Sequence, residues 1–415
     1  MLLKLYGKNV NWFNLYIYFY LFVTPWHFSK SQLSVLTTIL LIWSIVKYKD
    51  IYLEKLKKVG SFLPMIFLLI FIVYSYVSTL WSEPISQGLE HVNTFYKYYF
   101  LIIPAILISM NKEESVIGIK VLVLSFGCYA LYSILIYLGF FNSIEYGFQP
   151  ENPTGHLRYL IATQYMLMAF FLGSFFVYFS HIKKEKILFL IIAILSFFAL
   201  FINNSRTSQL AFFIILLILT VLILKKYIFN FKAIILFLII SFSSIYFLYK
   251  NDKFDRFVIA YNETKKVLEN NTYSGSVGLR IYFNKVGFEI FKDNLFFGTG
   301  PKDNRILLQE KQKLDTNYNA RIINHFHSEH MDTLTAYGLI GYSLLFLSIV
   351  ILIYNLRKIP LYYYMSLTIF LSLFFNSFAN KTLSVKPLNY VYIIFFLLFV
   401  IIAFNEKNKK ESKLS

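Results

Sequence analysis

The sequence predicts an all-α, polytopic membrane protein, and three observations support this fold class. The chain of 415 residues is 57% hydrophobic and 20% aromatic, with a mean hydropathy of +0.58. Soluble domains rarely have such a composition. Apolar runs of about twenty residues, the length that crosses a bilayer, recur along the chain. Basic residues gather in alternate short loops, as the positive-inside rule describes.

The apolar runs predict about twelve transmembrane helices. Pro25 and Trp26 are expected to end the first run early, because proline cannot continue a helix. The expected spans are 11–28, 32–48, 62–81, 95–110, 116–140, 159–180, 187–203, 208–224, 231–249, 333–354, 360–378 and 388–404.

Loop charges predict the orientation. With a cytoplasmic N-terminus, the inner loops carry clusters such as Lys55–Lys58 and Lys183–Lys186, and the outer short loops carry far fewer basic residues. Both termini are therefore expected in the cytoplasm. The net charge of +18 then reflects membrane topology, and no nucleic-acid partner is expected.

The same topology divides the chain into four parts. Spans one to nine occupy 1–249, an extracytoplasmic, mostly helical loop domain follows at 250–332, spans ten to twelve occupy 333–404, and a cytoplasmic tail covers 405–415. In the loop domain we expect amphipathic helices at about 253–269 and 279–292 and a turn at 294–304. The single cysteine, Cys128, excludes intramolecular disulfides and cysteine-based metal sites.

A histidine cluster, His325-Phe326-His327-Ser328-Glu329-His330, ends the long polar segment directly before an apolar run. His327 is a candidate general base, because a neutral imidazole is available near pH 7. Glu329 or a backbone carbonyl would orient its ring. Two alternatives stay open, a metal site formed by His325, His327 and His330, and plain interfacial histidines.

Arg206 lies in a short polar break, Asn203 to Ser208, between two apolar runs on the predicted outer face. An arginine near membrane depth usually faces a cavity or a partner, and its planar fork of donors suits phosphate oxygens. The alternative is an interfacial arginine that extends to the lipid headgroups.

Arg280 follows Ser276-Val277-Gly278-Leu279 at the predicted start of the second amphipathic helix. Free N–H groups at a helix start beside an arginine can bind an anion. The alternative is a solvated surface arginine. His156 and Arg158 are a further polar pair on the same face.

These residues all fall on one side of the membrane. Two arginines and a potential base fit a lipid-linked pyrophosphate donor, whose leaving group needs charge neutralisation. The chain has neither a Gly-rich phosphate loop nor paired carboxylates for a metal-bound sugar nucleotide. The donor is therefore expected to be activated already.

Several motifs resemble the O-antigen ligase family of membrane glycosyltransferases. The His325–Glu329 cluster precedes Gly338-Leu339-Ile340-Gly341, similar to that family's turn into a span. Ser205-Arg206-Thr207 and the segment from Gly278-Leu279-Arg280 to Gly300 resemble its two arginine regions. Ser328 departs from the asparagine that is common in the family. The motif order and the sidedness extend this resemblance over most of the chain.

The resemblance implies an inverting transferase in the bacterial inner membrane with a periplasmic active site. Its donor would be a glycan on undecaprenyl pyrophosphate, and its acceptor a sugar hydroxyl of lipid A–core. His327 would be the catalytic base, and Arg206 and Arg280 would bind the pyrophosphate. His325, Glu329, His330, His156 and Arg158 are expected to help bind substrate, with membrane lipids as further partners. No metal or other cofactor is expected.

Two alternative functions remain. An O-antigen or capsule polymerase would use the same donor but add it to another lipid-linked glycan. A secondary transporter or flippase would show inverted repeats and broken helices at mid-membrane with intramembrane charges. No such break is evident in the sequence.

Overall fold

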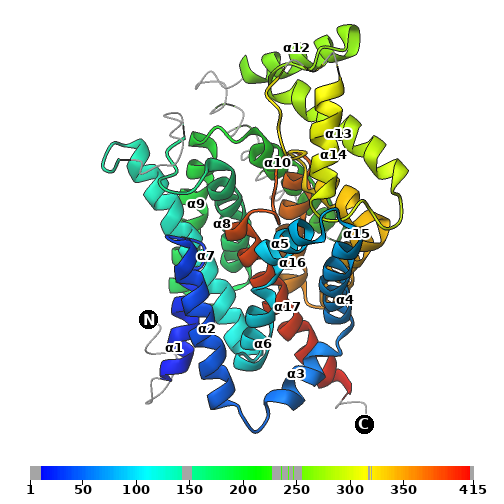
Figure 1. Cartoon of the computed structure of the whole chain (residues 1–415). Coiled ribbons are helices and arrows are strands. Elements are labelled where there is room, and N and C mark those ends of the chain that lie inside the picture. The colour runs from blue at the N-terminus through cyan, green and yellow to red at the C-terminus, as the bar shows by residue number, and fades with distance from the viewer. Residues whose placement is uncertain are drawn as a thin grey trace.

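The computed structural model describes residues 11–142, 152–226, 255–315, 318 and 320–411, with the single residues 235, 242 and 246. Over these residues the protein is helical and contains no strand, which confirms the all-α fold class. The elements (Figure 1) are α1 (Trp12–Val23), α2 (Lys30–Lys47), α3 (Tyr52–Gly60), α4 (Leu63–Val77), η2 (Ser78–Trp81), α5 (Ile85–Tyr96), α6 (Tyr99–Ser109), α7 (Lys112–Tyr137), α8 (Tyr159–Phe179), α9 (Lys183–Ile202), α10 (Arg206–Lys226), α12 (Asp255–Asn270), α13 (Gly275–Asp293), α14 (Asp303–Leu314), α15 (Glu329–Leu356), α16 (Pro360–Ser377) and α17 (Lys386–Glu411).

Eight helices of the described chain are long and apolar enough to cross a membrane, or nine if a bent pair counts as one span. The expected number of twelve is therefore not confirmed. The first run ends at Val23, just before Pro25 as expected, and α1 is too short to qualify. α2 bends by 114° into α3, so that α3 does not extend the span. The expected span at 231–249 lies almost wholly outside the described residues.

Some short helices outside the expected spans were not predicted. The run expected at 95–110 corresponds to α6, but the chain before it forms an amphipathic helix, α5, which was not predicted and which together with α6 makes one candidate span, Ile85–Ser109. α14 was likewise missed inside the loop domain. Both helices mix charged and apolar residues over a few turns, and such short patterns carry little hydropathy signal.

α17 is the central helix of the bundle. Within its most apolar stretch, 94% of the residues are buried by protein, more than in any other candidate span. The sequence explains this position, because residues 390–403 are apolar on every side of the helix. α6, α7, α15 and α16 pack around it (Figure 1).

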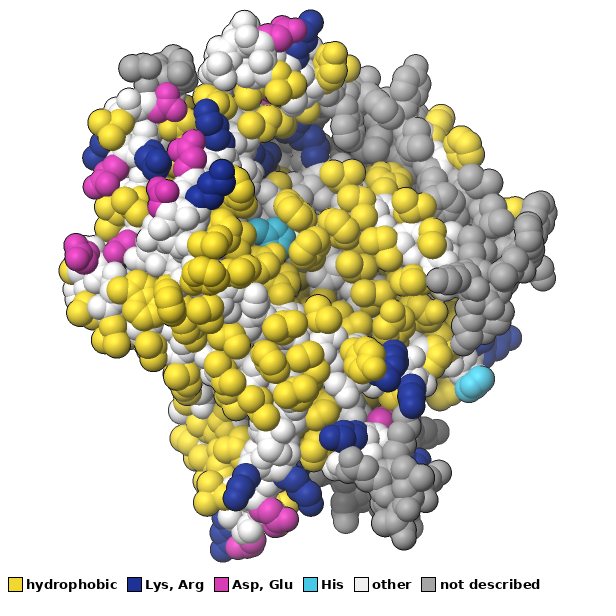
Figure 2. All heavy atoms as spheres, turned by 90° about the vertical axis from the view of Figure 1, so that its right-hand side faces the viewer, with side chains coloured by type: hydrophobic (Ala, Val, Ile, Leu, Met, Phe, Trp, Pro, Cys, Tyr) yellow, Lys and Arg dark blue, Asp and Glu magenta, His cyan; other side chains and the backbone are white. Residues whose placement is uncertain are grey.

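The outer part of the molecule consists of α12, α13 and α14, which share a second hydrophobic core. Its members include Tyr282, Phe283, Leu308 and Phe326. α1 begins and α17 ends on the opposite side of the bundle from α12 (Figure 1). Figure 2 shows a broad apolar area across the face of the molecule that it presents, with charged side chains concentrated above and below it. The expected start of the first loop helix at Lys253 lies outside the described residues.

α15 is interrupted at Gly338, which has φ +63° and breaks the helix near its outer end. The segment 295–300 fills the interruption. Leu339 and Ile340 donate their N–H groups to the carbonyls of Leu295 and Phe296, at 2.8 and 3.2 Å. In return, Thr299 and Gly300 donate to the carbonyls of Thr335 and Ala336, at 2.8 and 3.1 Å. The break falls inside the span expected at 333–354, at the first residue of the Gly338–Gly341 motif. Glycine tolerates the positive φ, which hydropathy does not reveal.

Replacing Gly338 by alanine should destabilise the protein by about 3 kcal/mol or more, through a left-handed backbone and a steric clash. A Cβ at this position would lie 2.3 Å from the carbonyl oxygen of Phe296. Gly60→Ala is the matched control, since a Cβ there meets nothing within 4 Å. Thermal unfolding of the detergent-solubilised protein measures the difference. Equal melting temperatures for the two variants would contradict this account.

Candidate active site

The histidine cluster lies where the outer helices meet the start of α15, and its backbone is fixed from both sides. Phe326 is fully buried in the outer core. Ser328 caps α15, accepting from the N–H of Met331 at 3.3 Å and donating to the carbonyl of Ser377 at 3.1 Å. His327, between these two anchors, has φ +53°. This conformation is uncommon for a residue other than glycine and is typical of functional sites.

The His327 ring stacks on Phe283 of α13, with centroids 5.7 Å apart, and the His325 ring lies 4.1 Å from it. Burial, followed by the charges of Arg280 and Lys381, lowers the pKa of His327 to about 4. Burial, followed by Lys381, lowers the pKa of His325 to about 3. Both imidazoles are therefore neutral at pH 7 and have a lone pair that can accept a proton.

Arg206 and Arg280 meet at Ser276. The Nη2 of Arg206 donates to Ser276 Oγ at 2.9 Å, and the Nη1 of Arg280 donates to the Ser276 carbonyl at 3.4 Å. Burial, together with the nearby charge of Arg206, lowers the pKa of Arg280. Arg280 precedes Phe283 by one helical turn, on the face of α13 that meets His327. The structure thus brings the two predicted arginines and the predicted base together.

The polar break before α10 holds Arg206 in place. Ser208 donates to Asn376 Oδ1 at 2.9 Å and accepts from Ser205 at 3.1 Å, which ties the start of α10 to α16. Asn204 donates its N–H to Asn152 Oδ1 at 2.8 Å. Ser205 and Ser208 are buried, so these bonds lie in a region of low dielectric and fix the helix start.

The start of α13 differs from the expectation. α13 begins at Gly275, so Arg280 lies inside its second turn. The N–H of Val277 donates to Glu263 Oε2 of α12 at 2.7 Å. At least one N–H group that was expected to be free for an anion is therefore taken by a carboxylate of the protein itself.

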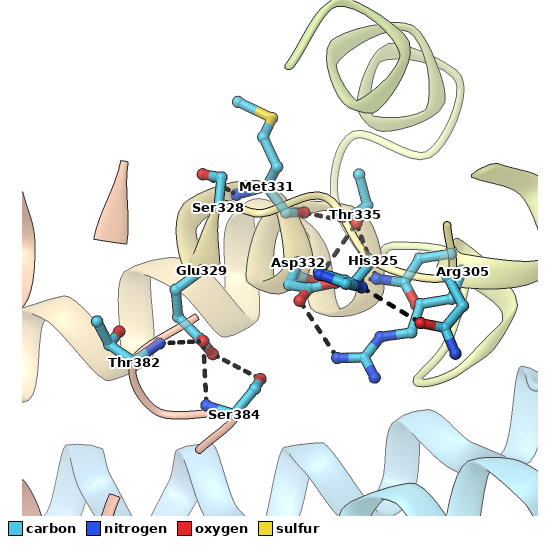
Figure 3. A network of polar contacts seen from close by, with 11 residues as sticks. Arg305, His325, Ser328, Glu329, Met331, Asp332, Thr335, Thr382 and Ser384 are labelled. Carbon is cyan, nitrogen blue, oxygen red and sulfur yellow. Dashed lines mark hydrogen bonds and ion pairs between the residues drawn. The ribbon is translucent and has the colours of Figure 1, made fainter. Parts of the chain in front are cut away.

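Glu329 is buried and holds the loop between α16 and α17. Its Oε2 accepts from the N–H groups of Thr382 and Ser384, both at 3.0 Å, and its Oε1 accepts from the Ser384 hydroxyl at 2.9 Å. Figure 3 shows this carboxylate pointing to the loop, away from Asp332 and His325. These bonds show that Glu329 holds the loop in place, whereas its role in substrate binding stays a prediction.

His330 is buried among aromatic rings of α15 and α16. Its Nε2 bonds to the Phe374 carbonyl at 2.9 Å, and its Nδ1 bonds to the Tyr342 hydroxyl at 3.1 Å. His330 therefore points away from the His325–His327 pair. In the part of the chain that the structure describes, no group of three His, Cys, Asp or Glu side chains is placed to hold a metal ion.

The structure does not bring the other predicted pair, His156 and Arg158, to the same place. His156 bonds through Nε2 to the Trp26 carbonyl and stacks on Phe28, with centroids 5.0 Å apart. Arg158 is exposed at the start of α8, and its charge lowers the pKa of His325 and of Lys381. Arg158 therefore lies near the histidines, whereas His156 packs against the first turn of the chain after α1.

The sequence reading missed an ion pair beside the cluster. Arg305 of α14 bonds to Asp332 of α15 at 3.2 Å, with side chains 13% and 5% exposed. Both line a small polar pocket together with His91, Tyr96 and Glu329. Asp332 lies one turn after Ser328 in the same apolar helix, and that position was an available signal of a buried acid.

The fold and the site together define a multi-pass membrane protein with a cluster of cations and neutral histidines at one end of its bundle. Residues 190–346 match the model of the family described as O-Antigen ligase, which confirms the resemblance read from the motifs. The match covers less than half of the chain, and Arg206, Arg280 and His327 all lie within it. No curated protein matches the chain.

Replacing Glu329 by glutamine should destabilise the loop after α16, because a neutral amide offers one uncharged acceptor oxygen where the carboxylate offers two charged ones. We expect a loss of about 2–4 kcal/mol, as for other buried charge-assisted bonds. Glu289→Gln is the control, since its ion pair with Lys311 is largely exposed. Thermal unfolding compares the two variants. A Glu329→Gln protein as stable as the control would show that these bonds do not hold the loop.

Proposed function

We propose that the protein is an O-antigen ligase that transfers a glycan from undecaprenyl pyrophosphate to a sugar hydroxyl of lipid A–core. The reaction would take place at the periplasmic face of the bacterial inner membrane, with both termini cytoplasmic and without a metal. One observation carries the proposal. Arg206, Arg280 and His327, from three distant parts of the sequence, converge beside one another within the segment that matches the family.

In the proposed reaction, the acceptor oxygen attacks the anomeric carbon of the donor from the face opposite the diphosphate. His327 takes the hydroxyl proton as the new carbon–oxygen bond forms, and the bond to the diphosphate breaks. Arg206 and Arg280 neutralise the charge that develops on the departing diphosphate. The attack from the opposite face inverts the configuration at that carbon.

The electrostatics of the site support the order of these events. Burial, and after it the cations around His327, lower the pKa of the ring, so the ring is neutral before the donor binds. The negative charge of a bound diphosphate offsets those cations and raises the proton affinity of the ring. His327 would thus become a stronger base only once the donor is in place.

The broken helix does not favour a transporter. In transporters, interrupted helices line a substrate cavity near the middle of the bilayer. Here residues 295–300 fill the interruption at Gly338, and their backbone groups form hydrogen bonds with the N–H and carbonyl groups of α15 on both sides of it. The site residues lie at one end of the bundle, as a transferase acting at a membrane surface requires.

An in vitro transfer assay tests the proposal. Purified protein receives an undecaprenyl-pyrophosphate glycan and, in separate reactions, lipid A–core or a second lipid-linked glycan, with a chelator and no nucleotide. We expect a single addition to lipid A–core. A ladder of products on the lipid-linked glycan would instead identify a polymerase. Loss of transfer in chelator, with rescue by zinc, would favour a metal site formed by the histidines.

Replacing His327 by asparagine should lower transfer by about 10²–10⁴-fold, the usual contribution of a general base. Asparagine tolerates positive φ, so this variant keeps the backbone that His327→Ala would strain. His181→Asn is the control, since His181 is exposed in the loop between α8 and α9. Near-normal transfer by a folded His327→Asn protein would remove the assignment of the base.

Replacing Arg206 by lysine should lower donor kcat/KM by about tenfold or more, because lysine lacks the planar fork that binds two phosphate oxygens. Arg357→Lys is the control, since Arg357 is exposed after the other end of α15. Steady-state transfer with varied donor concentration measures the effect. Full activity with lysine would make Arg206 an interfacial anchor.

A further inference from the structure

Lys381 lies in the loop between α16 and α17, outside the segment that matches the family. The residues on both sides of it are bonded to Glu329. The Asn380 carbonyl accepts from the Glu329 N–H at 3.1 Å, and the Thr382 N–H donates to Glu329 Oε2 at 3.0 Å. Arg280 Nε also donates to the Ala379 carbonyl at 3.2 Å. The backbone of Lys381 is thus fixed by α13 and α15, the helices that carry Arg280 and follow His327.

The Lys381 ammonium is partly buried among other cations. Burial, together with the charges of Arg305 and Arg158, lowers its pKa to about 8. Its own charge lowers the pKa of His325 and of His327, so it lies close to both rings.

The nearby carboxylates do not neutralise it. Asp332 and Glu329 act on Lys381 only at a distance, raising its pKa. Asp332 is paired with Arg305, and Glu329 is bonded to the loop backbone. Among the described residues, none forms a hydrogen bond or an ion pair with the Lys381 ammonium. A half-buried cation among other cations costs free energy unless an anion joins it.

We propose that Lys381 is a third ligand of the donor diphosphate, binding phosphate oxygens on the side of the site next to His327. This inference rests on the proposed function. A diphosphate offers more acceptor oxygens than two guanidinium groups fill, and an ammonium supplies three donors without fixed geometry. Arg206, Arg280 and Lys381 come from α10, α13 and the α16–α17 loop, so they would contact the diphosphate from different sides.

Binding of inorganic pyrophosphate to the full-length protein in detergent tests this ligand, with calorimetry as the readout. Lys381→Met keeps the side-chain length and removes the charge, and we expect affinity to fall about tenfold, the value of one charge-assisted bond. Lys381→Arg should retain most of the affinity. Lys313→Met is the control, because Lys313 is exposed on α14 and carries the same charge.

The outcomes separate the two proposals. Unchanged pyrophosphate affinity in Lys381→Met, with loss in Arg206→Lys, would overturn the role of Lys381 and leave the proposed function standing. Unchanged affinity in both variants, or no binding by the wild type, would overturn the diphosphate site itself. Thermal unfolding of Lys381→Met shows whether a lower affinity is caused by a loss of stability. Removing an unneutralised cation should not lower the melting temperature. A large drop in stability that accounts for the lost affinity would count against the proposal.

Discussion

The carboxylate of Glu329 is the point on which the geometry of the site depends. It is buried, and its bonds to Thr382 and Ser384 join the first turn of α15 to the loop before α17. That loop in turn accepts a bond from Arg280. A single acidic side chain thus sets the relative positions of the histidine segment, one arginine and Lys381. A buried carboxylate can do this only when several N–H and O–H donors satisfy it, as they do here.

Hydropathy and loop charge predicted the parts of the fold that depend on the bilayer. The long spans α7, α8, α9 and α15 appear within a few residues of their expected bounds, because a membrane sets both their length and their composition. α5 and α14 were not predicted, because short amphipathic helices are defined by packing partners that are distant in sequence. Hydropathy did not predict the break in α15 at Gly338 either, because it does not depend on the backbone hydrogen bonds that α15 forms with residues 295–300.

The site could be predicted in part for a similar reason. Arg206, Arg280 and the histidines stand out as polar residues at the ends of apolar runs, and charge topology places them on one side. The sequence cannot show which of them face one another. His330 and His327 are three residues apart, yet one is enclosed by Phe374 and Tyr342 while the other stacks on Phe283. Arg305 was missed because its sequence context does not show that it pairs with Asp332.

The interruption of α15 also bears on how the protein assembles. In lipid, a backbone N–H without a partner is costly, and a continuous helix normally avoids this without help from other segments. Here the outer end of α15 obtains its partners from residues 295–300, which are synthesised earlier and lie outside the bundle. α15 therefore cannot complete its hydrogen bonding on its own during insertion. Folding of the outer helices and of this span is consequently cooperative, and damage to either part is transmitted to the other.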